Sequence, residues 1–577
     1  MTVHRYAALL GARPAQAEQA RAAAGPLGLE ILADRPGLLF LGEAEGSIAS
    51  IAGGRGVLWG RLFRRGSPMA IAPDFAADLN SDAIVTLLNN SYWGSFVAIV
   101  ENGPQPVLFR DASGAMPAYH AALATGRILT SDVRMIAALT GHSPGINWDA
   151  VATGLRFRDA RTSATMLEGV EELLPGMALT LDRAQPKPRL IWNPATYMAP
   201  RTGRLAEAAE IVREAVLLGI AGLSSGYDHP LLELSGGVDS SIVAAGLAVA
   251  ARRASCVSFE GSGADLNESR YANAVATRFG FPLEIVQPDP AAIDVTRSAA
   301  SHLPRPNARH FLQATDAISR AAARDRDCDA FVNGGGGDDI FCSLTTVAPV
   351  LDRWQAQGWR GLLAGARDLA RLREVSPWEA LRRTVVRRLR PRPIRQGIDT
   401  PELLAPALQS LPRPDEHPWL TASRAMPVGR QGHLVGILRI QNYLEGRDTR
   451  KDAPVLMPLL SQPVMEACLG VPSWLWCADG INRAVARAAF ANLLPALVIE
   501  RTSKGGFDAF SARALAHSRA HAREMLLDGH LARHGLLDRP TVARCFEEGV
   551  PMRGAISTQL LTLIDTEAWV RSWHAAP

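Results

Sequence analysis

The fold of the second half of the chain is decided by nine residues, Leu234-Ser235-Gly236-Gly237-Val238-Asp239-Ser240-Ser241-Ile242. An apolar strand, Pro230 to Leu234, leads into them, and the apolar run Ile242 to Val249 follows as a helix. The two glycines let the backbone turn sharply and approach a ligand, and the N-terminus of a helix directs unpaired N–H groups at an anion. Asp239 adds a carboxylate, which suits Mg²⁺ shared with phosphate oxygens. The stretch therefore predicts a phosphate site with magnesium.

This loop is not a P-loop, because its spacing differs from G-x-x-x-x-G-K-[ST] and no lysine follows the glycines. It is typical of enzymes that split ATP into AMP and pyrophosphate. The alternative is a Gly-rich turn capped by serine or aspartate, which needs no ligand. We expect the loop to bind ATP through Ser235, Gly236, Gly237, Asp239, Ser240 and Ser241.

Composition limits the class of protein. At 577 residues the chain is long enough for two or more domains, and 47% hydrophobic with 20% charged residues is ordinary for a globular protein. A net charge of +4 argues neither for nor against nucleic acid as a partner. The six cysteines are scattered without a C-x-x-C pair, so we expect neither disulfides nor structural zinc. We find no signal peptide and no long apolar run, and we expect a cytoplasmic protein without a membrane segment.

The pattern of apolar residues changes near residues 195 to 205, so we divide the chain into 1–200 and 201–577. The first part has short alternating apolar runs, typical of strands in a β-rich layered domain. In the second part strands alternate with helices, which predicts a doubly wound parallel sheet with its ligands at the carboxyl ends of the strands. We expect strands at 231–234, 256–259, 283–287 and 330–332, and helices at 205–222, 240–253, 268–279 and 311–324. From about 350 onward the pattern is helical.

A second glycine-rich segment follows the last of these strands and reads Asn333-Gly334-Gly335-Gly336-Gly337-Asp338-Asp339-Ile340-Phe341. At the carboxyl end of a strand, four glycines and two acids would bring backbone and carboxylates to the nucleotide, beside Asp239. Alone, the segment is equally typical of a flexible loop. Together with the first loop it predicts two acids that share Mg²⁺.

Both segments resemble those of the asparagine-synthetase-like amide ligases, which carry an S-G-G-x-D-S loop and a later G-x-G-x-D-E-x-F element. The resemblance implies a glutaminase-like N-terminal domain of the N-terminal-nucleophile type and an ATP-pyrophosphatase domain. It implies that Asp239 and Asp338 are the magnesium ligands. It also implies that adenine and ribose are bordered by Leu234, Val257, Ser258, Phe259 and Gly334. Gly335 stands where asparagine synthetases have an acid and β-lactam synthetases a tyrosine, which counts against both activities.

A third match near the C-terminus follows the family's order of elements, with Pro458 to Glu466, then Gly480 to Arg487, then Arg501-Thr502-Ser503-Lys504-Gly505-Gly506-Phe507. By this resemblance Lys504 is the catalytic cation that neutralises the α-phosphate as the adenylate forms. A lone lysine on a loop is otherwise usually solvated. Arg483 and Arg487 are spaced for one helix face, and a purely solubilising surface role is open for them.

The N-terminal segment departs from the glutamine-using members, which begin with Met-Cys and use the cysteine as nucleophile. Here residue 2 is threonine, and the first cysteine is Cys256. Later segments, Gly94 to Val97 and Arg110 to Tyr119, still resemble the glutaminase domain. We therefore predict a retained fold without the nucleophile, and no release of ammonia from glutamine.

With ammonia not supplied, the attacking amine should already be on the substrate, and the combination of features is most similar to lasso-peptide cyclases (macrolactam synthetases). The resemblance implies that ATP adenylates an Asp or Glu side chain of a precursor core peptide and that the peptide's N-terminal amine closes an isopeptide ring. It implies a leader peptidase and a leader-binding protein as partners, and no nucleic acid. Alternatives are a β-lactam-synthetase-like or asparagine-synthetase-like ligase for small molecules, a tRNA-modifying enzyme and a non-catalytic scaffold.

Arginines crowd one further segment, at positions 382, 383, 387, 388, 390, 392 and 395. A solvated helix end with its loop is the simplest interpretation. The other is a docking surface for an acidic partner or peptide.

Overall fold

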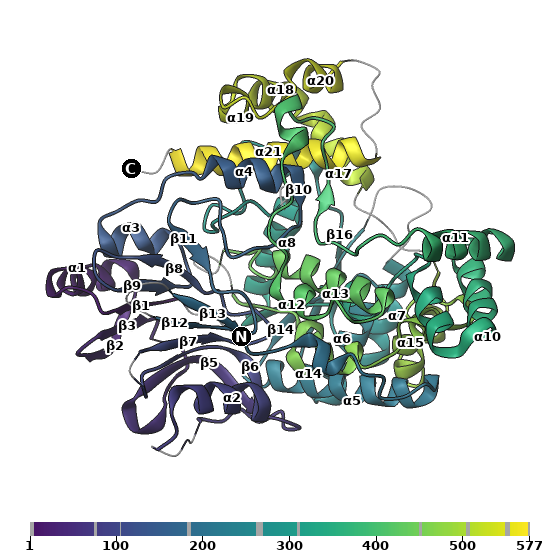
Figure 1. The fold of residues 1–577 in the computed structure, drawn as a ribbon, viewed down its shortest axis with the longest axis horizontal. Helices are drawn as coiled ribbons and strands as arrows, with labels where there is room; N and C mark the ends of the chain where they lie inside the picture. Colours follow the sequence, from purple (N-terminus) through teal and green to yellow (C-terminus); the bar gives the residue numbers. More distant parts are fainter. Residues whose placement is uncertain are drawn as a thin grey trace.

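The computed structural model of the chain describes residues 5–44, 46–73, 75, 78–103, 105–181, 186–260, 269–307, 312–448, 453–502, 508–547 and 554–574. Two parts pack side by side, a β-rich N-terminal part and a mixed α/β part (Figure 1). This arrangement confirms the fold class expected from the sequence.

The N-terminal part is a sandwich of two antiparallel sheets with helices outside. One sheet runs, in spatial order, β11 (Val170–Glu172), β8 (Tyr119–Ala122), β9 (Arg127–Thr130), β1 (Tyr6–Leu10), β3 (Leu38–Gly42) and β2 (Glu30–Arg35). The other runs β13 (Lys187–Leu190), β12 (Met177–Thr180), β7 (Val107–Arg110), β6 (Tyr92–Val100), β5 (Gly56–Arg64) and β4 (Ile48–Ser50). Between the sheets, the buried ring of Trp59 contacts Tyr6 and Phe40 at centroid distances of 6.3 and 5.5 Å.

Helices complete the layers of this part. Helices α1 (Pro14–Ala24) and α3 (Arg134–Thr140) share an apolar cluster with the outward residues of the first sheet, such as Leu9. Helix α2 (Ser81–Ser91) packs on the second sheet, where Leu88 joins Leu58. The result is a four-layer arrangement of helix, sheet, sheet and helix, as expected for a β-rich layered domain.

The second part contains a parallel sheet with helices on both faces. Its strands, in spatial order, are β16 (Leu283–Val286), β15 (Ser255–Phe259), β14 (Pro230–Glu233), β17 (Ala330–Asn333) and β19 (Val455–Leu456). Residues alternate between the faces, so Leu232 packs into the cluster with α5 (Leu205–Ser224), α6 (Val238–Val249) and α7 (Ser269–Phe279). Leu231 and Phe331 pack toward α8 (Gln313–Asp325) instead. The predicted doubly wound sheet is therefore present.

The order of the strands brings the two glycine-rich segments together. From β14 the chain proceeds to one side through β15 and β16, and later returns on the other side of β14 as β17. Glu233 and Asn333, the last residues of β14 and β17, are paired in register. The segments that follow both strands therefore leave the sheet next to each other, at the switch point where such sheets bind ligands.

The boundaries of the central elements differ slightly from the predictions. Helix α6 begins at Val238, not Ser240, because Gly237 takes the extended conformation of the N-cap. It ends at Val249 and not at residue 253. Asp239 consequently lies in the first turn of the helix, where the helix dipole favours a negative charge.

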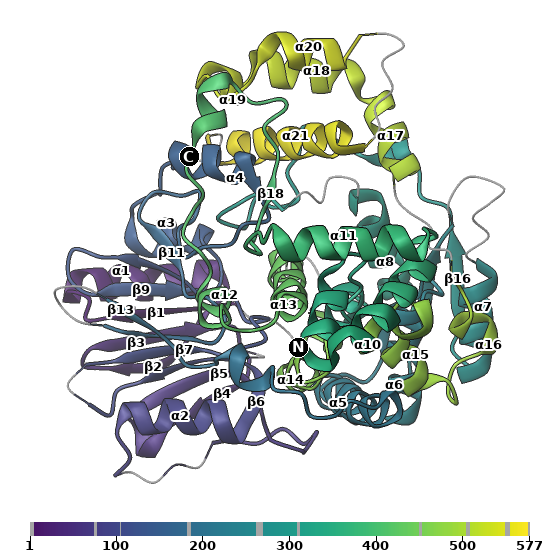
Figure 2. The same cartoon turned by 45° about the vertical axis from the view of Figure 1, so that its right-hand side comes forward.

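The remaining chain is mostly helical, as expected. A hairpin of α10 (Ala348–Arg373) and α11 (Pro377–Leu389) lies on the outside of the α/β part, and α13 (Val428–Ile440), α14 (Gln462–Leu469) and α15 (Ala484–Phe490) pack inside it. The C-terminal helices α17 (Asp508–His517), α18 (Arg519–Asp528), α19 (His530–Arg533), α20 (Arg539–Cys545) and α21 (Gly554–His574) lie together above both parts (Figure 2). Their apolar residues share a cluster with α4 (Trp148–Arg156) of the N-terminal part.

All six cysteines are free thiols. Of the helices in the described ranges, none is long and apolar enough to cross a membrane.

A buried charged cluster joins the two main parts. Glu172 accepts hydrogen bonds from Arg110 (2.8 Å), from Arg161 and from Arg305 (2.7 Å). Arg110 also reaches Glu445, from the segment after α13, at 3.2 Å. The arginine that begins the glutaminase-like segment Arg110 to Tyr119 thus has a structural role in holding the parts together.

Candidate active site

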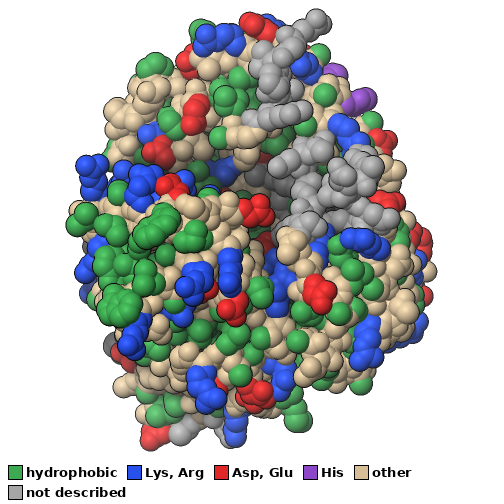
Figure 3. All heavy atoms as spheres, turned by 90° about the vertical axis from the view of Figure 1, so that its right-hand side faces the viewer, with side chains coloured by type: hydrophobic (Ala, Val, Ile, Leu, Met, Phe, Trp, Pro, Cys, Tyr) green, Lys and Arg blue, Asp and Glu red, His purple; other side chains and the backbone are tan. Residues whose placement is uncertain are grey.

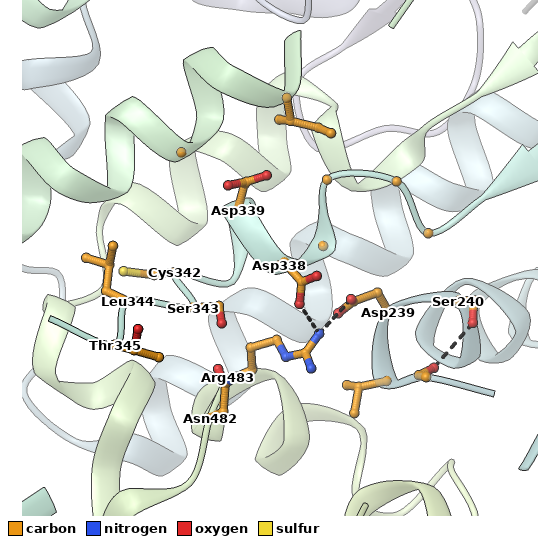
Figure 4. A pocket seen from close by; sticks show the side chains of 18 of the residues that line it. Asp239, Ser240, Asp338, Asp339, Cys342, Ser343, Leu344, Thr345, Asn482 and Arg483 are labelled. Carbon is orange, nitrogen blue, oxygen red and sulfur yellow. Dashed lines mark hydrogen bonds and ion pairs between the residues drawn. The ribbon is translucent and has the colours of Figure 1, made fainter. Parts of the chain in front are cut away.

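A cavity of about 1800 Å³ opens at the carboxyl end of the parallel sheet. Both glycine-rich segments line it, together with α13, the segment before α15 and the chain around Arg501. Figure 4 shows the side chains at its centre. The two segments that the sequence assigned to one nucleotide site therefore do face one space.

The first segment forms a compact turn between β14 and α6. Gly236 has φ of +67°, and a Cβ there would lie 2.5 Å from the Cβ of Tyr271, so only glycine fits. The hydroxyl of Ser235 accepts a hydrogen bond from the N–H of Gly237 (3.3 Å) and lies 3.2 Å from the hydroxyl of Ser240. These bonds fix the loop, and the first turn of α6 that follows it lines the cavity, a position that favours a phosphate.

The second segment packs directly on the first, and two glycines allow it. A Cβ on Gly334 would come within 2.5 Å of the backbone nitrogen of Ser240. A Cβ on Gly337 would lie 2.3 Å from Cγ of Asp239. Gly334 and Gly337, which were expected to let the backbone approach a nucleotide, are thus also needed for close contact between the two loops.

Arg483 lies between the two predicted magnesium ligands. Its Nη1 donates to Oδ2 of Asp239 and to Oδ1 of Asp338, at 2.6 Å in each case. Figure 4 shows the guanidinium reaching between the carboxylates, which come from α6 and from α9 (Gly337–Ile340). Arg483 is only 7% exposed. The proposed solubilising surface role of Arg483 is therefore wrong, because a turn before α15 aims its side chain inward.

Arg487 is buried as well, and it serves the backbone. Its guanidinium donates to the carbonyl oxygens of Asn482 (2.8 Å) and Arg501 (2.7 Å) and also reaches that of Ile499. These bonds fix the chain that leads toward residue 503. A surface role for Arg487 is wrong for the same reason, since it is 8% exposed.

The donor set at the centre of the cavity fits a small divalent cation. Asp239 and Asp338 place oxygens on either side of one cationic nitrogen, so they lie close enough to share a cation. Mg²⁺ is commonly held by one or two carboxylates together with phosphate oxygens and water. In the described part of the chain no group of three or more His, Cys, Asp or Glu side chains gathers as a metal site.

Asp339 turns away from this pair. Its Oδ1 accepts a hydrogen bond of 2.6 Å from Arg439 on α13, and Figure 4 shows its carboxylate directed away from Arg483. Of the two acids that end the second segment, only Asp338 therefore faces Asp239.

The other predicted binding residues divide into two groups. Leu234, Ser235, Gly237, Ser240, Val257, Ser258, Phe259 and Gly334 line the cavity with Asp239 and Asp338. Gly236 and Ser241 are not among the described residues that line it, since Gly236 packs against α7 and Ser241 is fully buried. Lys504 lies outside the described residues, as does Thr2.

One wall of the cavity, which the N-terminal part supplies, could not be predicted from any sequence pattern. Asp159 has φ of +65° and accepts a hydrogen bond of 3.1 Å from the hydroxyl of Tyr443. Both residues line the cavity. Burial raises the pKa of the Asp159 carboxyl above its usual value, partly offset by Arg158 and by the bond from Tyr443. The cavity is thus built from both parts of the chain.

Comparison with known proteins gives three findings. The family model described as asparagine synthase matches residues 230–573, which is more than half of the chain. The carboxyethyl-arginine beta-lactam-synthase of Streptomyces clavuligerus is 30% identical over 230 residues, covering 38% of this chain and 42% of that protein. The chain therefore matches less than half the length of this curated relative. A solved allosteric regulatory enzyme of purine biosynthesis shows 9% identity and a TM-score of 0.21 over 49% of this chain and 64% of its own, which is too weak to carry an argument.

Proposed function

The chain belongs to the asparagine synthase family, and from this we propose that it is an ATP-dependent, AMP-forming ligase that closes a macrolactam in a lasso precursor peptide. The observation that carries the proposal is the convergence of Asp239 and Asp338 on one cation, at the switch point of a parallel sheet. Two carboxylates sharing a cation beside an open helix N-terminus suit the binding of a magnesium-nucleotide.

In the proposed reaction, a side-chain carboxylate oxygen of an Asp or Glu in the peptide attacks the α-phosphorus of ATP. The bond between the α-phosphorus and the bridging oxygen breaks, and pyrophosphate leaves. The peptide's α-amine then attacks the carbonyl carbon of the acyl-adenylate, AMP leaves, and the nitrogen gives up a proton. The net result is one amide bond and the loss of one water from the peptide.

The chain's residues would mainly bind, orient and neutralise charge. Asp239 and Asp338 would hold Mg²⁺, which when bound supplies positive charge to the phosphates. The N-terminus of α6 would bind a phosphate, and the strand-end residues Val257 to Phe259 would border adenine. Arg483, which binds both carboxylates, would provide one cation for the phosphates, and Lys504 would provide a second at the α-phosphate.

The size of the cavity favours a peptide over a small amino acid. Its volume of about 1800 Å³ exceeds the roughly 300–1,000 Å³ typical of small-molecule sites. The nucleotide and a folded segment of peptide could both occupy it. The partners we propose are the precursor core peptide, a leader peptidase that frees its amine, and a leader-binding protein.

A second candidate is a ligase of the β-lactam-synthetase type that joins a carboxylate and an amine within a small molecule. The 30% identity over 230 residues to the carboxyethyl-arginine beta-lactam-synthase favours it. Gly335 speaks against it, because no acidic or phenolic side chain stands at this position.

Mass spectrometry tests the proposal and separates the candidates. Purified protein is incubated with ATP, Mg²⁺ and a candidate precursor peptide whose leader has been removed, and AMP and the peptide mass are followed. We expect AMP together with loss of one water from the peptide, and neither product with Asp239→Asn. AMP formed with a small amino acid but with no peptide would support the second candidate and contradict the first.

A further inference from the structure

The hairpin of α10 and α11 concentrates positive charge. Residues 359–395 contain 11 arginines and 3 acidic residues, a net charge of +8, whereas the whole chain carries +4. The rest of the chain is therefore net negative, at −4. A charge separation of this size is more than solubility requires, because a mixed surface of either sign keeps a protein soluble.

The same hairpin exposes large apolar side chains. Five of them are well exposed: Trp359 (66%), Leu363 (48%), Trp378 (78%), Val386 (45%) and Leu389 (75%). The hairpin does not need them for its own packing, because Val350, Leu369 and Ala380 belong to a separate buried cluster inside it. Apolar side chains gathered on one surface among charges are typical of an interaction site. A merely solvated helix end would not expose two tryptophans.

This surface borders the catalytic cavity. Arg371 and Glu374, at the end of α10, line the cavity, and so do Arg395 and Ile398, in the segment after α11. Figure 3 views the face to which α10 and α11 belong, and hydrophobic side chains gather there among Lys and Arg, beside a hollow in the surface. A molecule that leaves the cavity past these residues would therefore pass directly onto the hairpin.

Several arginines of the hairpin remain available to a ligand. Arg382 and Arg383 pair with Glu379, and Arg387 donates to backbone carbonyls that follow α11. Four others are exposed, and no acidic side chain in the described ranges pairs with them: Arg388, Arg390, Arg392 and Arg395. We call these four arginines and the five exposed apolar residues the hairpin surface.

We infer that the hairpin surface binds the part of the peptide substrate that lies outside the cavity, and that this part is rich in acidic and apolar residues. The inference rests on the proposed function, since a peptide ligase must hold a chain that extends beyond the reacting groups. Exposed guanidinium groups can pair with carboxylates in a bidentate manner, and tryptophans provide large contact areas. A lipid surface or a nucleic acid is less suited to this position, because either would cover the mouth of the cavity that the substrate needs.

Fluorescence anisotropy tests the inference without requiring catalysis. The probe is a fluorescein-labelled synthetic peptide rich in glutamate, leucine and phenylalanine, titrated with the full chain at physiological salt. We expect Arg388→Glu/Arg390→Glu to weaken binding by about tenfold or more, and Trp378→Ser to weaken it by a smaller factor. The matched control is Arg523→Glu/Arg533→Glu, which makes the same charge change at exposed positions on α18 and α19 and should leave binding unchanged.

Further measurements distinguish an acidic peptide from other ligands of the hairpin surface, and they separate this inference from the proposed function. A probe with glutamine in place of glutamate should bind weakly. Unchanged probe binding by Arg388→Glu/Arg390→Glu would overturn the inference, as would tighter hairpin-dependent binding of phosphatidylglycerol vesicles or a single-stranded oligonucleotide. Asp239→Asn should bind the probe like the unaltered chain while failing to form AMP. If no peptide supports AMP formation yet hairpin-dependent binding persists, the proposed reaction fails and the binding surface stands.

Discussion

At the scale of single residues, Arg483 has the most direct effect on the chemistry of the site. Two carboxylates so close together repel each other unless a cation lies between them. Arg483 supplies that cation, with Nη1 at 2.6 Å from an oxygen of each. Because Mg²⁺ would be attracted by the same two oxygens, Arg483 and the metal should compete for the pair, and the guanidinium would then be free to bind phosphate.

This competition predicts that Arg483→Met makes stability depend on Mg²⁺. Removing the guanidinium takes away the cation that Asp239 and Asp338 share, which should cost about 1–3 kcal/mol, at the lower end because Asp338 is partly exposed. Thermal unfolding in EDTA should show a lowered Tm, and added Mg²⁺ should raise it more than in the unaltered chain. Arg439→Met is the control, since Arg439 lines the same cavity but pairs with Asp339, which turns away from Asp239 and Asp338. Equal Mg²⁺ responses in both variants would show that Asp239 and Asp338 do not hold the metal.

Sequence patterns could predict some residues of the site but not others. Asp239 and Asp338 follow strands of one parallel sheet, so their convergence follows from topology. The inward direction of Arg483 could not be predicted, because its spacing from Arg487 suits a surface face equally well. Asp159 lies in the other part of the chain, at a positive φ that no local pattern signals. Such residues reach the cavity only through the packing of the two parts.

At the scale of elements, the contact between the two glycine-rich loops predicts a contrast between Gly337→Ala and Gly237→Ala. A Cβ on Gly337 would overlap Asp239, whereas one on Gly237 meets only the hydroxyl of Ser235, at 3.3 Å and with an ordinary φ of −75°. Gly337→Ala should therefore displace Asp239 and reduce ATP-dependent AMP formation by more than about tenfold. Gly337→Ala should also lower the Tm, whereas Gly237→Ala, whose Cβ meets no backbone atom, should keep it. A reversed order of the two variants would contradict the packing described here.

A buried histidine on helix α13 should make the stability of the protein depend on pH. This histidine, His433, donates from Nε2 to the carbonyl oxygen of Ile340 (2.8 Å) and so supports α9, which carries Asp338. Burial is the main reason that the pKa of His433 falls to about 4, against about 6.5 in an unfolded chain. Between these values the unfolded chain binds more protons, so stability is lost as the pH falls below about 6.5.

Replacing this histidine with glutamine should therefore flatten the acid side of the stability profile. Compared with the unaltered chain, His433→Gln should lose about 2 kcal/mol less between pH 7.5 and pH 5, measured by urea unfolding at each pH. His142→Gln, at an exposed position, should leave the profile unchanged. The slope will not vanish, because burial also lowers the pKa of His120 and of His417 to about 3.

At the scale of the whole molecule, the layers and the parallel sheet could be predicted because strand and helix periodicities differ. The return of the C-terminal helices onto the N-terminal part could not, since no local pattern encodes which surface a terminal helix covers. The same holds for the charged cluster around Glu172. The segment Arg110 to Tyr119, which resembles part of a glutaminase domain, therefore has a structural role, because Arg110 holds the two parts together.

The cluster predicts that Glu172→Gln destabilises both parts at once. Burial alone would raise the pKa of Glu172, but Arg161, Arg305 and Arg110 hold it well below its usual range, so the carboxylate is charged and paired. Neutralising it leaves buried arginines without their common partner, which should cost about 3–5 kcal/mol. We expect a single unfolding transition at a clearly lower Tm, because the cluster joins both parts. Glu171→Gln is a matched control on the same strand. The Glu171 side chain is 56% exposed, and its carboxylate comes no closer than 3.7 Å to His120 and 4.0 Å to Arg127. Its effect should stay below about 0.5 kcal/mol. Equal stability of the two variants would mean that other contacts between the parts, such as the Arg65–Glu466 ion pair and the apolar packing, hold them together, and that the arginine segment has no role in joining them.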